Sequence, residues 1–221
     1  MKGEKDEKKV CRIVGAGEMT SFFHVEKGDF IIAADGGLAY LNRFGVSPDL
    51  ILGDFDSLSE SPAGENVLTF PVEKDDTDMM LAVKEGLSHG CEVFFLYGGV
   101  GGRLDHTLAN IQTLCFLAEK GKTGILVGEK ECLTALQNGS VTLSSEKGGT
   151  VSVFSAGDRA EGVFERGVKY AVENVTLTNS FPLGVSNSLI SAKAEIGVKN
   201  GMLVILWETK GGKNRLFDWM P

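Results

Sequence analysis

The sequence has none of the features that mark secreted, membrane-spanning or zinc-binding proteins. Its first ten residues, MKGEKDEKKV, contain no apolar run, so we expect neither a signal peptide nor a membrane anchor, and we predict a mobile charged tail over residues 1–9. Its three histidines lie far apart and offer no zinc spacing. No C-x-x-C pair joins its four cysteines, which are Cys11, Cys91, Cys115 and Cys132. We therefore expect reduced, mostly buried thiols in a cytoplasmic protein.

Basic character is lacking as well. Lys and Arg number 22 against 30 Asp and Glu, which gives a formal net charge of −8. Without a basic patch to contact phosphates, the chain is not expected to bind nucleic acid. An acidic protein that handles phosphates needs metal ions as a bridge. Hydrophobic residues make up 43% of the 221-residue chain, which is typical of a soluble globular protein with room for one large or two small domains.

The N-terminal part alternates apolar segments with amphipathic ones. Helical patterns at 36–46, 77–90 and 105–121 lie between several of the apolar segments. Continuous apolar strands alternating with helices indicate an α/β domain with a mostly parallel sheet flanked by helices, which we place at residues 10–137. The predicted strands are 11–16, 29–35, 49–54, 67–71, 92–98 and 124–128.

After about residue 136 the pattern changes to shorter, more alternating runs with no convincing helix between them. The Asn-Gly pair in KNGM, residues 199–202, is a hairpin signal. These runs predict a C-terminal antiparallel β-sandwich over residues 138–221. The predicted strands are 140–145, 149–156, 168–178, 188–198 and 202–208.

Two aspartates stand at the end of one predicted strand. In LILGDFDSL, residues 50–58, an apolar strand runs through Gly53 into Asp54 and Asp56, which share a face of an extended segment while Phe55 points the opposite way. Two carboxylates held together repel each other unless a divalent cation or a shared proton lies between them. A polar turn closed by Ser57 is the alternative explanation for this stretch.

Similar residues follow other predicted strands or begin the next helix. Because ligands of open parallel sheets bind beyond the carboxyl ends of the strands, we expect these residues to share one site. Carboxylates beside a glycine-rich loop and an arginine suit a metal-bound phosphate ligand. Taken singly, an aspartate can cap a helix, a histidine can be structural, and the glycines can form a flexible loop. The residues are Asp35, Gly36, Asp75, Asp76, Thr77, Asp78, Gly98, Gly99, Gly101, Gly102, Arg103, Asp105 and His106.

Three common phosphate-binding patterns are absent or incomplete. No G-x-x-x-x-G-K-[ST] sequence is present, so the chain is not a P-loop enzyme. Gly15 and Gly17 form half of a dinucleotide fingerprint, but Thr20 stands where its third glycine belongs. The D-x-D loop of haloacid-dehalogenase-like phosphatases follows the first strand, whereas DFDS follows the third predicted strand here.

The ordered set DGG, PDLILGDFDS, KDDTD, GGRLDH and GVSN closely resembles thiamine pyrophosphokinases, over roughly Ile32 to Leu206. The resemblance implies an α/β domain followed by a β-sandwich, a homodimer, and transfer of pyrophosphate from ATP to thiamine, giving AMP and thiamine diphosphate. Tyr170 stands where members of the family often carry a tryptophan or another aromatic residue.

With this resemblance, the residues at the strand ends gain roles. Asp54, Asp56 and Asp78 are expected to bind Mg²⁺ directly. Asp75 or Asp76 is expected to lie next to these ligands without contacting the metal. The glycine loop, Arg103 and Asp105 are expected to hold ATP, and Asp35 is a candidate for either substrate. The resemblance implies that Ser186 and Asn187 meet the thiamine pyrimidine. Two alternatives stay open: a metal-dependent phosphohydrolase that uses water, and a module that binds a nucleotide or thiamine without turning it over.

Overall fold

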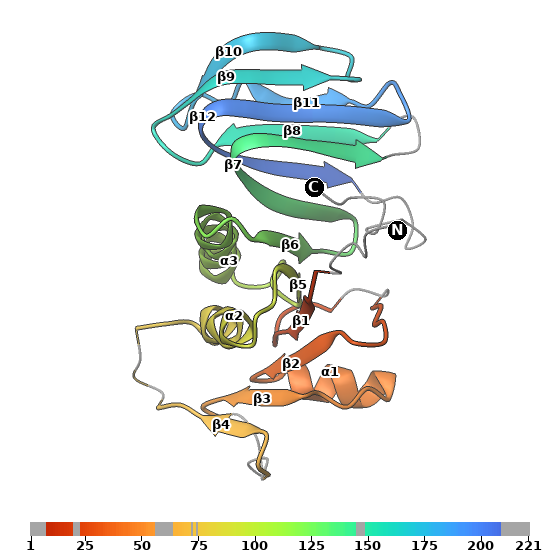
Figure 1. Cartoon of the computed structure of the whole chain (residues 1–221), viewed down its shortest axis with the longest axis vertical. Helices are drawn as coiled ribbons and strands as arrows, with labels where there is room; N and C mark the ends of the chain where they lie inside the picture. Colours follow the sequence, from red (N-terminus) through yellow and green to blue (C-terminus); the bar gives the residue numbers. More distant parts are fainter. Residues whose placement is uncertain are drawn as a thin grey trace, which may run out of the picture.

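A computed structural model describes residues 8–19, 23–55, 64–71, 73, 75–144 and 149–208 (Figure 1). Its N-terminal part contains a parallel sheet with the strand order β4-β3-β2-β1-β5-β6. The strands are β1 (Val10–Val14), β2 (Phe30–Ala34), β3 (Leu50–Gly53), β4 (Val67–Thr69), β5 (Val93–Tyr97) and β6 (Thr123–Val127). All six were predicted from their apolar runs, and the mixed α/β class is confirmed.

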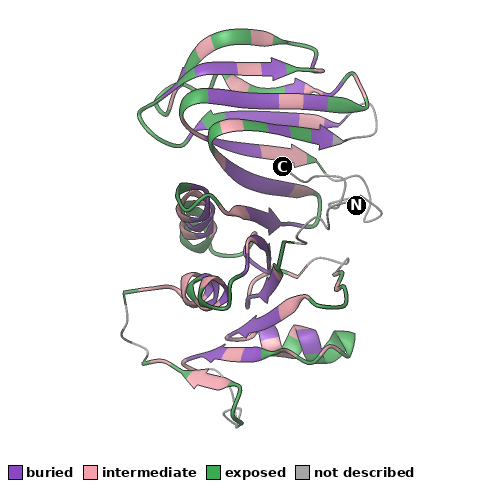
Figure 2. Cartoon of the chain, viewed as in Figure 1, coloured by how far each residue is buried: buried purple, intermediate pink, exposed green. Residues whose placement is uncertain are grey.

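Helices cover both faces of this sheet. The helices α2 (Asp78–Ser88) and α3 (Leu104–Glu119) pack side by side on one face, and α1 (Gly37–Phe44) lies on the other (Figure 1). The strands are therefore buried from both sides, as in VFFLY of β5, where every residue is buried (Figure 2). This double burial explains why the strands are apolar without alternation.

The helix boundaries follow local signals. Gly45, at the C-terminal end of α1, has φ 67°, a left-handed conformation that favours glycine. At the N-terminus of α2, the hydroxyl of Thr77 accepts a hydrogen bond from Met80 N at 3.2 Å. The suggestion that Asp75 or Asp76 caps this helix is therefore wrong, because Thr77 occupies the cap position.

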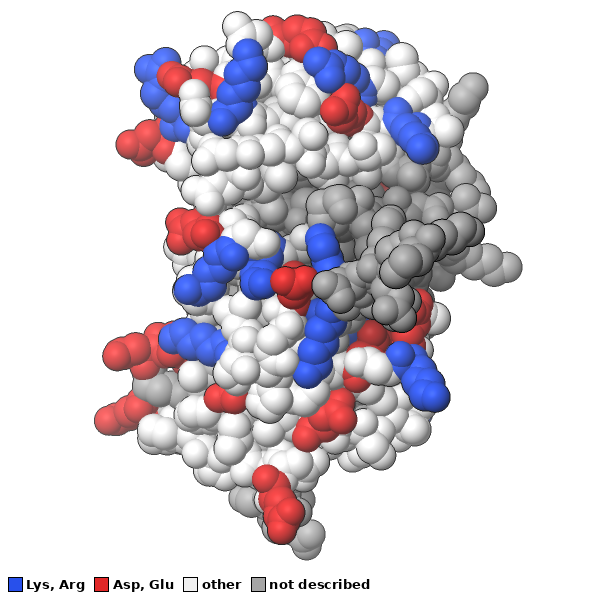
Figure 3. Space-filling model, in the orientation of Figure 1, with Lys and Arg blue, Asp and Glu red and all other residues white. Residues whose placement is uncertain are grey.

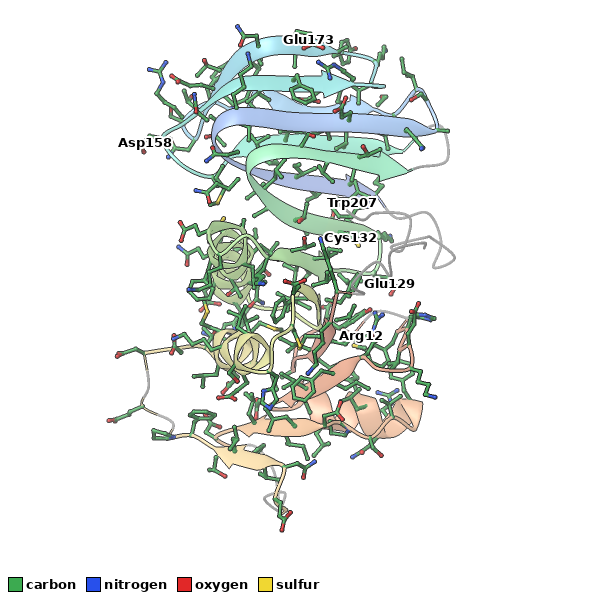
Figure 4. The ribbon with its side chains drawn as sticks, viewed as in Figure 1. Arg12, Glu129, Cys132, Asp158, Glu173 and Trp207 are labelled. Carbon is green, nitrogen blue, oxygen red and sulfur yellow. The ribbon has the colours of Figure 1, made fainter. Side chains whose placement is uncertain are left out.

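Two long antiparallel strands connect the parallel sheet to the C-terminal β-domain. The first part of β7 (Glu131–Ser144) pairs with β6, and the whole of β7 pairs with β12 (Lys193–Glu208). The second half of β12 pairs with β8 (Thr150–Ser155), and its first half pairs with β9 (Arg159–Arg166). Cys132 and Trp207, which are register partners on β7 and β12, mark the end of these strands nearest the parallel sheet (Figure 4).

The β-domain has two layers because β7 and β12 pass from one layer to the other. One layer continues from β12 through β8 to β11 (Gly184–Ser188), and the other continues through β9 to β10 (Val172–Thr178). A core of small and branched apolar side chains lies between the layers, including Val153, Val163, Ile196 and Ile205. The predicted β-sandwich is confirmed.

The expected hairpin at KNGM is wrong. β12 continues through residues 199–202 without a turn. Its pairing with β7 shifts register between Val198 and Met202. Gly201 has φ 115°, and its N–H donates to Asn138 Oδ1 at 2.9 Å. The Asn-Gly pair therefore forms a bulge, which bends β12 where β7 bends at Asn138, φ 47°. The predicted domain boundary after residue 137 falls beside this bulge, inside β7, and stays a prediction.

Several strand assignments in the β-domain differ from the prediction. The run 188–198 is not one strand, because β11 ends at Ser188 and β12 begins at Lys193. The first half of β7, the whole of β9 and β11 before Ser188 were missed, and the predicted strand 168–178 begins only at Val172, as β10. β9 reads RAEGVFER, in which charged residues stand beside the buried Ala160 and Val163, so its apolar signal is weak.

One buried ion pair supports the α1 face of the parallel sheet. The guanidinium of Arg12, on β1, is 1% exposed, pairs with Asp29, and donates to the Tyr97 hydroxyl at 3.1 Å (Figure 4). Burial raises the pKa of Tyr97, and the neighbouring Arg12 charge partly offsets this effect. The ion pair therefore links β1 to the residue that precedes β2, and the bond to the Tyr97 hydroxyl links β1 to β5.

The surface and the cysteines agree with the composition. Lys and Arg side chains are interspersed with Asp and Glu on the face shown in Figure 3, and no continuous basic area appears there. None of the helices in the described ranges has the length and apolar character needed to cross a bilayer. Cys11, Cys91 and Cys132 are buried, which confirms the expectation of mostly buried thiols.

Candidate active site at the carboxyl edge of the parallel sheet

Two acidic strand ends lie in contact at this edge. Asp35 directly follows β2, and its N–H donates to Leu52 O of β3 at 2.7 Å. A Cβ atom on Gly53 would lie 3.1 Å from the Cα atom of Asp35, so the two backbones touch where Asp54 begins. Asp35 has φ 49°, a left-handed conformation that aspartate tolerates better than most residues. The Asp35 and Asp54 side chains therefore leave neighbouring strand ends, as the sequence predicted.

Phe55 changes the expected path of the DFDS stretch. It has φ 56° and is 3% exposed, so the segment is not extended at this residue. The expectation that Asp54 and Asp56 share a face assumes an extended backbone between them, and Phe55 does not have one. A left-handed conformation in a bulky residue is strained, and such strain clusters at functional sites. Asp56 itself lies outside the described residues.

The first turn of α2 brings another carboxylate to this edge. The Met79 side chain reaches Gly15, at the end of β1, where a Cβ atom would lie 2.9 Å from the Met79 Cε atom. Asp78, the residue before Met79, has a buried Oδ1 atom, as does Asp35. Asp76 instead forms an ion pair with Lys84 at 2.5 Å, and Asp75 is exposed. Of the acidic residues of KDDTD, Asp78 is therefore the one with a buried carboxylate oxygen next to the sheet edge.

The glycine-rich loop after β5 contacts the loop after β1, backbone against backbone. Gly17 N donates to Gly98 O, and Gly15 N donates to Tyr97 O, both at 2.9 Å. Gly98 has φ 65°, and a Cβ atom on Gly17 would lie 2.4 Å from Gly98 O. Side chains are therefore excluded from this junction. Gly101, φ 87°, and Gly102, φ 66°, continue the loop in the same left-handed region.

Two residues beside this loop were missed by the sequence analysis. Asn110, on α3, is 5% exposed, and its Nδ2 donates to Gly99 O at 2.8 Å. The available signal was a polar residue on the buried face of an amphipathic helix. Glu18 lies beside Gly101, where a Cβ atom would come within 2.7 Å of the Glu18 Oε2 atom. Asn110 holds the base of the loop, and Glu18 places a further carboxylate at its tip.

Arg103, Asp105 and His106 lie at the exposed N-terminus of α3. Arg103 binds both carboxylate oxygens of Asp105, at 3.2 Å and 2.6 Å. The Arg103 guanidinium lowers the pKa of Asp105 through this hydrogen-bonded pair. The three side chains are therefore available at the rim of the site, with Arg103 and Asp105 already joined.

The donor chemistry fits a hard divalent cation. No group of three His, Cys, Asp or Glu side chains close enough to hold a metal ion occurs within residues 8–208 as far as they are described, and the predicted ligand Asp56 is not among those residues. The groups at the edge are carboxylates, and buried oxygen atoms of Asp35 and Asp78 are among them. Mg²⁺ prefers oxygen ligands of this kind, usually from one or two carboxylates plus substrate phosphates and water.

The residues predicted to meet thiamine lie in the β-domain and differ in exposure. Ser186, φ 58°, is exposed on β11, and its N–H donates to Ser152 Oγ at 3.0 Å. Asn187 is 6% exposed, and its Oδ1 and Nδ2 bond the N–H and the carbonyl of Tyr170, each at 3.0 Å. The Tyr170 side chain is exposed. Asn187 therefore holds Tyr170 in place, while Ser186 and Tyr170 face outward.

These features define a class of protein. A parallel sheet covered by helices ends in an edge of carboxylates and close-packed glycines, the place where open α/β sheets bind their ligands. A second, all-β domain continues from the same sheet through β7 and β12. The chain is thus an α/β protein with an acidic ligand site and an appended β-domain.

Comparisons with known proteins identify the family. Residues 24–126 match the family model described as thiamin pyrophosphokinase, catalytic domain, and residues 140–203 match thiamin pyrophosphokinase, vitamin B1 binding domain. The chain is 28% identical over 189 residues to the thiamine pyrophosphokinase of Bacillus subtilis strain 168, covering 80% of this chain and 86% of that protein. The chain therefore belongs to the thiamine pyrophosphokinase family, and it is an enzyme with thiamine diphosphokinase activity.

Solved structures agree with this assignment. The crystal structure of thiamine pyrophosphokinase from Bacillus subtilis superposes with a TM-score of 0.81 at 25% identity, covering 92% of this chain and all of that one. The crystal structure of thiamin pyrophosphokinase from Geobacillus thermodenitrificans gives 0.79 at 25% identity, covering 91% of this chain and 98% of the other. Both similarities extend over the parallel sheet and the β-domain together.

Proposed function

We propose that the enzyme transfers pyrophosphate from ATP to the hydroxyl of thiamine, in a reaction that depends on Mg²⁺, giving thiamine diphosphate and AMP. The observation that supports this most strongly is the meeting of Asp35 and Asp54 at adjacent strand ends beside a glycine-rich loop. A triphosphate and an attacking hydroxyl need mainly positioning and neutralisation of charge, which such an edge supplies.

In this proposal the acidic residues bind the metal ion and the glycine loop binds the nucleotide. Asp54, Asp56 and Asp78 are the proposed Mg²⁺ ligands, and bound Mg²⁺ would neutralise charge on the phosphates. The backbone N–H groups of the glycine loop, together with the Arg103 side chain, orient the nucleotide. Thr77 and Asp76 fix the start of α2 through the helix cap and the Lys84 ion pair. The remaining proposed nucleotide contacts are Asp35, Gly36, Asp75, Gly98, Gly99, Gly101, Gly102, Asp105 and His106.

Thiamine is proposed to bind between this edge and the β-domain. Its thiazolium ring carries a fixed positive charge, so an acidic site attracts it. Ser186 and Tyr170 present exposed polar and aromatic groups to the ring system. Asn187, which resemblance to the family assigns to the pyrimidine, acts here by holding Tyr170 and the β11 backbone.

We further propose a homodimer whose sites are shared between subunits. Among the described strands, β11 pairs with β8 alone, and its other edge is met only near Ser188, whose carbonyl accepts a hydrogen bond from Lys169 N at 2.8 Å. Large apolar side chains are exposed on β11 and around it. Monomeric proteins rarely expose an apolar sheet edge of this kind to solvent. A second copy of the chain, related by a twofold axis, covers this surface and gives two equivalent sites. The exposed residues are Phe154, Tyr170, Phe181, Leu183, Val185 and Ile190.

The proposed compartment is the cytoplasm. Three of the four free thiols are buried in the core, where they persist without pairing in a reducing environment.

The nucleotide product tests the reaction. The purified enzyme is incubated with ATP, thiamine and Mg²⁺, and the products are separated by chromatography. AMP and thiamine diphosphate are expected in equal amounts, activity should disappear with a chelator, and added Mg²⁺ should restore it. Thiamine monophosphate with ADP would show ordinary kinase chemistry, and phosphate released without thiamine would show a phosphohydrolase. Either outcome overturns the proposed reaction.

A further inference from the structure

One buried carboxylate lies outside the acidic edge described above. Glu165, on β9, is 3% exposed and points into the β-domain between its two layers. Its Oε2 atom accepts a hydrogen bond from Asn187 Nδ2 at 3.0 Å. Burial raises the pKa of Glu165, and the bond from Asn187 offsets part of that rise. A carboxylate is costly to bury, so its retention in an otherwise apolar core calls for a role.

The partner of Glu165 is an amide whose hydrogen-bonding capacity is fully used. Asn187 Nδ2 donates to Glu165 and to Tyr170 O, and Asn187 Oδ1 accepts from Tyr170 N and Ser188 N, each at 3.0 Å. An asparagine amide offers two donors and two acceptor positions, so none is left over. Tyr170 is thereby bonded through both polar groups of its backbone.

The carboxylate of Glu165 fixes which way this amide points. An ionised carboxylate only accepts hydrogen bonds, so it requires the NH₂ side of Asn187. Turning the amide over would place its carbonyl against the carboxylate and its NH₂ against the N–H groups of Tyr170 and Ser188. Glu165, together with the N–H groups of Tyr170 and Ser188, therefore holds the orientation in which Asn187 bonds the Tyr170 backbone.

The groups held by this chain of bonds are those facing the proposed thiamine position. Tyr170 is 63% exposed, and Ser186 precedes Asn187 on β11 with its side chain outward. A second bond, from Lys169 N to Ser188 O at 2.8 Å, ties the Tyr170 segment to the same strand. The Tyr170 segment thus depends on one buried amide, which stands next to Ser186 on β11.

We propose that Glu165 is a positioning residue for thiamine: it helps to orient the Asn187 amide, which in turn places Tyr170, without touching the substrate itself. This inference rests on the proposed position of thiamine beside Ser186 and Tyr170. It concerns affinity for thiamine alone, because Glu165 lies in the β-domain, away from the carboxylates and the glycine loop.

The test separates KM for thiamine from KM for ATP. In Glu165→Gln, KM for thiamine should rise about tenfold, the lower end of what supporting hydrogen bonds around a ligand contribute, while kcat and KM for ATP stay within about twofold. If the Gln variant fails to fold, Glu165→Met, of similar length and without a polar group, carries the same expectation. Glu161→Gln, an exposed glutamate on the same strand, is the matched control and should leave both KM values unchanged.

A double variant shows whether Glu165 acts through Asn187. Glu165→Gln should add no further rise in KM for thiamine when it is introduced into Asn187→Ala, because the amide that it orients is gone. An equal additional rise in that background would mean that the Glu165 charge attracts thiamine directly, and the positioning role would be wrong.

A last comparison distinguishes failure of this inference from failure of the proposed thiamine position. Ser186→His enlarges an outward side chain at a left-handed residue, a conformation that histidine adopts more readily than most. If Ser186→His leaves KM for thiamine unchanged, thiamine does not bind beside Ser186. The proposed role of Glu165, which depends on that position, is then wrong as well. If Ser186→His raises that KM and Glu165→Gln does not, or raises both KM values equally, only the role of Glu165 is wrong.

Discussion

Asp54 is the residue on which the proposed chemistry depends most. It follows β3 directly, and the glycine before it touches the Asp35 backbone at the end of β2. In Asp54→Asn the side chain keeps its size and loses the charge that a divalent cation needs. Turnover should fall by about a hundredfold or more, as happens when a key electrostatic group is removed. Steady-state kcat with saturating ATP, Mg²⁺ and thiamine measures this loss.

Stability provides the control for this variant. Removing one of several clustered carboxylates relieves repulsion, so the melting temperature of Asp54→Asn without metal should stay the same or rise slightly. Asp158→Asn, on the exposed turn between β8 and β9, should leave both activity and melting temperature unchanged (Figure 4). If Asp54→Asn unfolds the protein while its folded fraction keeps full activity, Asp54 has a structural role instead.

Glu165 makes stability depend on pH. Burial raises its pKa above the ordinary value of 4.5, so the native protein binds this proton more tightly than the unfolded chain does. The stabilising contribution is therefore complete below pH 4.5 and is lost as pH rises through the folded-state pKa. The free energy of unfolding of Glu165→Gln should improve relative to that of the natural protein between about pH 4 and pH 8.

Urea unfolding of the two proteins across this range measures the difference. A difference that stays constant with pH, or that shrinks as pH rises, would show that the folded-state pKa of Glu165 is not raised.

At the scale of elements, α3 supports the glycine loop through Asn110. The helix buries this amide against Gly99 O at 2.8 Å, which fixes the loop at its base. Asn110→Ala leaves that carbonyl without the amide and should lower the free energy of unfolding by about 1–3 kcal/mol. The less firmly held loop should also reduce kcat/KM for ATP by about tenfold or more, because a small displacement of the bound phosphates lowers the reaction rate strongly.

Gln112→Ala is the matched control, since Gln112 is exposed on the same helix. It should change the free energy of unfolding by less than about 0.5 kcal/mol. An Asn110→Ala variant that loses stability but keeps its kcat/KM for ATP would restrict Asn110 to a role in the fold.

The elements also show which features were predictable from the sequence. The parallel strands were predictable because burial on both faces makes them continuously apolar, and their ends could be located from glycine and aspartate. The path of β12 was not predictable, because Asn200-Gly201 suits a turn and a bulge equally well. What decided between them was the bend of β7 at Asn138, a residue more than sixty positions earlier in the chain.

The candidate site likewise has features that were predictable from the sequence and features that were not. The chemistry of Asp35, Asp54 and Asp78 is visible in the sequence, since two of these carboxylates follow predicted strands and the third begins a predicted helix, which indicates an oxygen-rich site. The left-handed Phe55 and the burial of Asn187 were not visible, because both depend on contacts between distant segments. The two hydrogen bonds from Asn187 to the Tyr170 backbone could not be predicted, because they form only when the two layers of the β-domain are assembled.

At the scale of the whole molecule, the parallel sheet and the β-domain share two strands, yet Ser186 lies on β11 at the far edge of the β-domain layer. A twofold partner can place its own β11 over the acidic edge of this chain. The structure also refines which variant tests this, because Asn187 holds the local fold and Ser186 does not. Ser186→His and Asp54→Asn are therefore the two inactivating changes to combine.

Mixed dimers give the prediction. When the two single variants are unfolded and refolded together in equal amounts, half of the dimers are mixed, and each has one site with both changes and one with neither. Activity should recover to roughly a quarter of that of the natural protein. If subunits demonstrably exchange and activity stays at the level of the separate variants, each site is built within one chain.

Transfer of an intact pyrophosphate group is the central claim, and isotopic labelling tests it most directly. Two parallel reactions contain thiamine, Mg²⁺ and ATP labelled at either the β- or the γ-phosphorus, and the label in thiamine diphosphate is measured against the AMP formed. We predict that both labels appear in thiamine diphosphate to the same extent, with one AMP for each molecule formed. Transfer of the γ-label alone, with ADP as the nucleotide product, would contradict this account.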